Sequence, residues 1–113
     1  MATDIRAKLS NCGISAQKAR LVIDSVRGKA AVEAIDLLRF TNKAAALPVR
    51  KLIASAVANA EENFGLSRDD LYVYKITADE APTRRWRRFG ARGRFKPILR
   101  RSSHIEVVLR ERK

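Results

Sequence analysis

The sequence predicts an α+β domain in which three helices pack on a three-stranded antiparallel sheet and a long β-hairpin protrudes. Three observations support this fold class. The first, central and last segments alternate apolar and polar residues or are rich in β-branched residues, which is typical of strands. Between the first two of these segments, apolar residues recur three times with helical spacing. Finally, about 25 residues separate two strands that should be neighbours, whereas a compact hairpin loop has about two to five.

The first strand is predicted over residues 3–10, because apolar residues fall at every second position and basic or polar residues lie between them. The first helix should follow from an N-cap at Ser15 and run to about Val26. Gly28 should end it, because glycine tolerates the left-handed backbone found after a helix.

The second helix is predicted over residues 29–40, where apolar residues share one stripe. The third is longer and should end at Gly65. Its start is ambiguous, since Thr41 or Asn42 could cap it while Pro48 would disturb its first turns. We expect it to begin near Asn42 and to bend at Pro48.

The remaining strands are predicted over residues 71–77 and 102–110, and they pair with the first strand in one sheet. The chain is therefore expected to be a single domain. Its body should comprise residues 1–80 and 102–113, and a basic hairpin arm should comprise residues 81–101. Gly90 and Gly93, near the middle of the arm, supply the permissive backbone that a hairpin tip requires.

The arm holds most of the charge of the chain. Residues 83–101 contain nine Lys or Arg and no Asp or Glu, so subtracting nine from the net charge of +12 leaves +3. This concentration predicts a large anionic partner. Eight of the nine cations are arginine. The arginine side chain can form two hydrogen bonds to one phosphate and can stack on bases. Trp86, Phe89 and Phe95 could stack on bases or pack across the hairpin.

Catalysis has little support in the sequence. The only histidine, His104, has no nucleophile beside it, which favours a structural or phosphate-contacting role. The acidic pairs, such as Asp79 with Glu80, are interpreted as solvated charges at helix ends and in turns. The single cysteine, Cys12, allows no internal disulfide and no metal cluster. We therefore expect a soluble, intracellular non-enzyme without cofactor or metal, and no signal peptide or membrane span.

Two kinds of nucleic-acid protein remain compatible with these features. One is a structural RNA-binding protein whose arm threads into folded RNA, and the other is an architectural DNA binder with a β-ribbon in the minor groove. A ribbon DNA binder usually has a dimer surface and an apolar wedge at the tip. The tip here is FGARGRF, and no surplus apolar face is evident, so RNA is favoured.

Several longer segments resemble one family over almost the whole chain. They are GISAQKARLVIDSVRGK, ASAVANAEENFGL, DEAPT, ARGR and ILRRSSHIEVVL, in that order. The family is that of bacterial large-subunit ribosomal protein twenty-two. This resemblance implies a body near the exit of the nascent-chain tunnel and an arm that runs inward through ribosomal RNA, where its tip forms part of the tunnel wall. The resemblance also implies that the protein acts in cytoplasmic ribosomes, where it would assist assembly, bridge segments of ribosomal RNA and line the tunnel.

We expect two kinds of functional residue, basic residues that bind RNA and residues at the tip of the arm that line the tunnel. The resemblance implies RNA contacts position by position, and the charge pattern adds Lys8, Arg87, Arg88 and His104. The expected RNA-binding residues are Lys8, Lys18, Arg20, Arg84, Arg85, Arg87, Arg88, Arg94, Lys96, Arg100, Arg101 and His104. The expected tunnel-lining residues are Phe89, Gly90, Ala91, Arg92 and Gly93. The implied partners are large-subunit ribosomal RNA, neighbouring large-subunit ribosomal proteins and the nascent polypeptide, with no membrane and no homo-oligomer.

Overall fold

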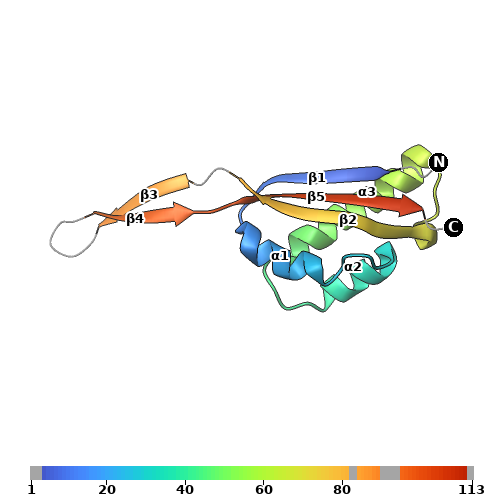
Figure 1. Cartoon of the computed structure of the whole chain (residues 1–113), viewed down its shortest axis with the longest axis horizontal. Helices are drawn as coiled ribbons and strands as arrows, with labels where there is room; N and C mark the ends of the chain where they lie inside the picture. Colours follow the sequence, from blue (N-terminus) through green and yellow to red (C-terminus); the bar gives the residue numbers. More distant parts are fainter. Residues whose placement is uncertain (1–3, 82–83, 90–94, 112–113) are drawn as a thin grey trace.

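The computed structural model describes residues 4–81, 84–89 and 95–111 of the chain. Within them it contains three α-helices, a three-stranded sheet and a separate two-stranded ribbon (Figure 1). The predicted fold class is confirmed, because the three helices pack on an antiparallel sheet and the ribbon protrudes from it.

The sheet has the strand order β1 (Ile5–Cys12), β5 (Ser103–Glu111), β2 (Leu71–Glu80), and both pairs are antiparallel. The last strand of the chain therefore lies in the middle. The alternation predicted for the first strand is confirmed, since Ile5 is buried while Lys8 is exposed. A register shift between Leu9 and Cys12 interrupts this alternation, and Cys12 is buried as well.

The first two helices lie close to their predicted positions. In α1 (Ala16–Asp24), the Ser15 side chain accepts a hydrogen bond from the backbone N–H of Lys18 at 3.4 Å, which confirms Ser15 as the N-cap. The helix ends before the predicted Val26, and turns lead on to Gly28 at a φ of 81°. α2 (Ala31–Arg39) lies within the predicted range.

The predicted start of the third helix near Asn42 is wrong. α3 covers Ala46–Phe64 with Ala45 at its N-cap, so Pro48 stands in the first turn. The first N–H groups of a helix have no partner inside it, and proline is therefore tolerated there. The helix begins just before Pro48 instead of bending at it. Gly65 ends the helix as predicted, at a φ of 64°.

The helices cover one face of the sheet (Figure 1). α1 and α2 pack against β2, whereas α3 packs against β1 and β5. All of these helices and strands contribute side chains to a single core. Burial of each large aliphatic side chain stabilises the fold by about 1.5–3 kcal/mol. Its largest fully buried side chains include Ile5, Ile23, Ile53, Leu71, Ile76, Ile105 and Leu109.

The arm is the ribbon formed by β3 (Arg84–Phe89) and β4 (Phe95–Arg100). It extends from the end of the sheet where β2 stops and β5 begins (Figure 1). The molecule measures 64 × 25 × 18 Å with a radius of gyration of 17.1 Å. A compact chain of this length would have a radius of about 13 Å. The elongation agrees with a hairpin that leaves the body.

Candidate RNA interface

Two of the six register pairs of the arm set a cation opposite a cation. Arg84 is in register with Arg100, and Arg88 is in register with Lys96. Like charges directly opposite each other destabilise an antiparallel pair, and a ribbon of two strands is only marginally stable in water. Phosphate groups beside the ribbon would remove this repulsion. The register therefore favours a polyanionic partner along the arm.

At one end of the sheet, β1 and β2 stop and β5 begins, and the arm starts there. We call this place the arm root. Ser103 is in register with Cys12 of β1 and with Glu80 of β2. It is completely buried, and its hydroxyl donates to the carbonyl oxygen of Ile14 at 2.8 Å. This hydrogen bond ties β5 to the segment between β1 and α1. The arm thus starts from a fixed point of the body.

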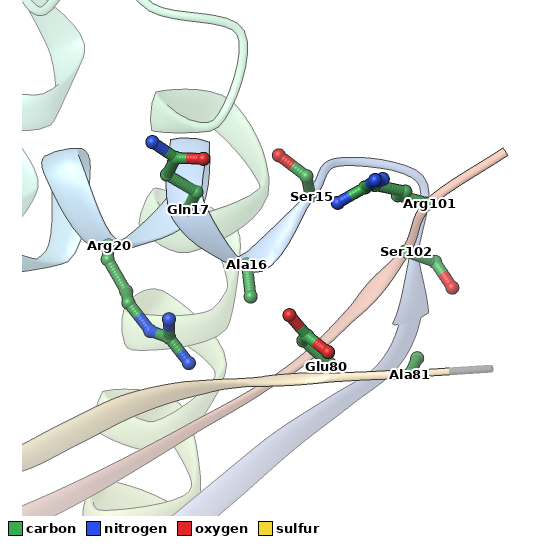
Figure 2. A pocket seen from close by; sticks show the side chains of 8 residues that line it. All are labelled: Ser15, Ala16, Gln17, Arg20, Glu80, Ala81, Arg101 and Ser102. Carbon is green, nitrogen blue, oxygen red and sulfur yellow. The ribbon is translucent and has the colours of Figure 1, made fainter. Parts of the chain in front are cut away.

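A pocket of about 440 Å³ lies at the arm root (Figure 2). The start of α1, the end of β2 and the junction between β4 and β5 build it. Its lining residues are Ser15, Ala16, Gln17, Arg20, Glu80, Ala81, Arg101 and Ser102. The side chains of Glu80 and Arg101 both point toward the start of α1 in Figure 2. We call this the arm-root pocket.

Two arginines fasten the α1 wall of this pocket to the sheet. The Nε of Arg20 donates to the carbonyl oxygen of Ala78 at 3.1 Å. One turn beyond α1, Arg27 donates to the carbonyl oxygen of Ile76 at 3.0 Å. Both acceptors belong to β2, so the two guanidinium groups hold the helix end and the strand at a constant separation.

An ion pair lies at the opposite end of the sheet. Arg110 Nε donates to Asp4 Oδ1 at 2.5 Å, and its guanidinium carbon lies 3.4 Å from the ring centroid of Tyr74. The hydrogen bond from Arg110 is the main cause that lowers the pKa of the Asp4 carboxyl below its ordinary value. Because Arg110 is engaged in this way, it is less available for RNA than the arginines of the arm root.

Residues 4–81, 84–89 and 95–111 contain no cluster of His, Cys, Asp and Glu that could hold a metal ion. No helix among them is long and apolar enough to cross a membrane.

The model of the family Ribosomal protein L22p/L17e matches residues 7–110. The chain belongs to this family. It is a structural, non-enzymatic component of the large ribosomal subunit, where it binds ribosomal RNA and lines the exit tunnel. Ribosomal RNA and ribosomal proteins are its partners.

Of the RNA contacts expected in this L22p/L17e chain, the structure brings one from the body and one from the base of the arm together, since Arg20 and Arg101 line the same pocket. Lys18 is exposed on α1 but does not line it. Lys8 lies apart, in a groove between β1 and α3. His104 is half-buried on β5, in register with Asp79.

The expected contacts in the arm fall into two groups. Seven of the expected residues belong to the ribbon strands, and for these the structure gives only strand membership and register. They are Arg84, Arg85, Arg87, Arg88, Phe89, Lys96 and Arg100. The others lie outside the described residues, so their expected roles stay predictions. They are Gly90, Ala91, Arg92, Gly93 and Arg94.

The sequence interpretation missed one side of the arm-root pocket. Asp79 and Glu80 were expected in a turn, which is wrong, because both belong to β2. Glu80 lines the pocket, as does Gln17. The only signal in the sequence is that Glu80 is the last acidic residue before residues 83–101, whose charged residues are all basic. Its meaning depends on register, which places the end of β2 beside the start of β5.

Proposed function

We propose that the arm anchors the protein in folded ribosomal RNA through the cations of β3 and β4, and that the arm-root pocket extends this contact onto the body. The tip, residues 89–93, then forms the tunnel wall that the nascent polypeptide passes. The body, residues 1–80 and 102–113, acts as a separate folded support. The observation that carries the proposal is the register of the ribbon, which sets Arg84 against Arg100 and Arg88 against Lys96.

Electrostatics supports this proposal over one in which the arm is only a solvated surface. A solvated ribbon would be expected to alternate cations with acidic residues, because like charges in register cost free energy. Residues 83–101 have no acidic residue at all. RNA supplies the missing counter-charge at regular intervals, and arginine can bind phosphate oxygens in a bidentate manner.

The salt dependence of RNA binding tests the proposal. Each phosphate that is neutralised releases counterions, at about 0.7–0.9 per contact. If six to nine cations of the arm engage phosphates, a log–log plot of affinity against salt should have a slope of about −4 to −8. The measurement uses a fragment of large-subunit RNA and the full chain. A slope shallower than about −2 would contradict the electrostatic account.

Substitutions at the two ends of the arm test its direction. Changing Arg84, Arg85, Arg100 and Arg101 to Gln removes charge-assisted contacts of about 1.5–3 kcal/mol each when they are desolvated. Incorporation into large subunits should then fall sharply. Arg92→Glu at the tip should leave incorporation near normal and alter the passage of nascent chains that stall easily. The opposite pattern, in which only Arg92→Glu prevents incorporation, would reverse the proposed direction.

A further inference from the structure

The arm-root pocket contains charged groups of opposite sign that do not pair. Within residues 4–81, 84–89 and 95–111, the ion pairs and side-chain hydrogen bonds involve neither the Glu80 carboxylate nor the Arg101 guanidinium. Both groups are exposed to solvent, and both line the pocket (Figure 2). Arg20 adds a second guanidinium, whose Nε is engaged with Ala78. The pocket thus offers an anion-binding group and a hydrogen-bond acceptor on its walls.

This combination disfavours the simplest ligands. A lone phosphate would be attracted by Arg101 and repelled by Glu80, while a cation or an amine would meet the reverse. The best ligand carries an anionic group at one end and N–H donors at the other. A nucleotide unit of RNA has this polarity, and a pocket of about 440 Å³ lies within the range of about 300–1,000 Å³ that is usual for ligand sites.

The carboxylate also distinguishes among the four bases. An ionised carboxylate is an acceptor only, with two oxygens that can receive two parallel hydrogen bonds. Guanine presents two adjacent N–H donors on its Watson–Crick edge, whereas uracil presents one N–H between two carbonyl groups. Adenine and cytosine place a ring-nitrogen acceptor beside their amino group, and this nitrogen would face the second carboxylate oxygen. Unstacked bases in RNA are commonly recognised on this edge.

We propose that the arm-root pocket binds a single unstacked guanosine nucleotide of the RNA, with its phosphate at Arg101 and its Watson–Crick edge at Glu80. The inference rests on the proposed function, because it assigns a nucleotide to the body part of the same RNA contact. It goes further in giving this part base specificity, which the arm cations alone cannot supply, since phosphate contacts carry no sequence information.

The test titrates the full chain, labelled with ¹⁵N, with the four nucleoside 5′-monophosphates and with inorganic phosphate. Guanosine monophosphate should shift the backbone amides of Gln17, Ala81 and Ser102. It should also bind about 5- to 150-fold more tightly than the other three, the factor of a good bidentate base contact. Equal affinities for all four, an inorganic phosphate affinity equal to that of guanosine monophosphate, or the absence of binding would each overturn the proposal.

Two variants separate the parts of the contact. Glu80→Gln should abolish the preference for guanosine monophosphate while leaving phosphate binding intact or stronger. Arg101→Gln should weaken all four monophosphates. The matched control is Glu62→Gln, an exposed carboxylate outside the pocket, which should behave like the wild type. A guanosine preference that survives Glu80→Gln would also refute the assignment.

The outcome for the pocket is independent of the outcome for the arm. If the RNA affinity keeps its steep salt dependence but the wild-type chain shows no guanosine preference, the pocket assignment fails and the proposed function stands. If the salt dependence is shallow, the proposed function fails whatever the nucleotides do. The same protein preparation serves both measurements.

Discussion

Removal of one buried hydroxyl should destabilise the body measurably. Ser103 is the only buried polar or charged residue among those whose burial the structure describes, and it is fully enclosed. Its hydroxyl donates to the carbonyl oxygen of Ile14 at 2.8 Å. Ser103→Ala removes this donor and leaves the carbonyl without it. The loss of this bond should cost about 1–3 kcal/mol, because the bond is part-buried and the Ile14 carbonyl is left without its donor.

Urea unfolding measures this loss. With an m-value of about 1.5 kcal/mol per M, the midpoint for Ser103→Ala should fall by roughly 0.7–2 M with an unchanged slope. Ser67→Ala is the control, because Ser67 is exposed and its side chain caps no helix. A Ser103→Ala midpoint within about 0.3 M of the wild type would refute the argument that this bond holds the arm root together.

Three further predictions concern the body. Gly65→Ala should cost about 1–2 kcal/mol by thermal unfolding, because φ is +64° there, whereas Gly13→Ala, with nothing within 4 Å of a new Cβ, should cost much less. Because the pKa of Asp4 is lowered by Arg110, its ion pair should stabilise the fold above about pH 4 and fade as pH falls through the lowered pKa. The stabilities of Asp4→Asn and wild type should therefore differ at pH 7 and converge in acid. Replacing residues 82–101 by a short glycine-containing turn should leave one cooperative transition by circular dichroism, and loss of that transition would contradict an independent body.

The strands and the first helix could be predicted because their signals are local. Alternation in residues 5–9 reports directly which side chains face the core, and Ser15 is followed by an apolar stripe. The start of α3 could not be predicted in the same way. Three alanines, residues 44–46, suit a helix equally well, so propensity does not decide between a cap at Asn42 and one at Ala45. Of the three, Ala45 and Ala46 are buried and Ala44 is exposed.

The candidate site was predictable only where its residues are cationic. Arg20 and Arg101 were expected as RNA contacts from charge and from family resemblance, and they line one pocket. The hydrogen bond from Arg20 to the Ala78 carbonyl could not be foreseen, because a main-chain acceptor leaves no trace in the residue type. Glu80 could not be assigned for a related reason. Its neighbourhood is set by strand register across the sheet, not by the residues beside it in the chain.

The distribution of charge predicts that the body and the arm depend differently on RNA. Outside residues 83–101 the net charge is only +3, and exposed ion pairs such as Arg68 with Glu61 add little to stability. We therefore expect the apolar core to hold the body together, so that it folds without a counter-ion. The arm has no acidic residue, and its register sets cations against each other. We therefore expect phosphate contacts to stabilise the ordered arm, so that ordering and RNA binding of the arm are thermodynamically coupled.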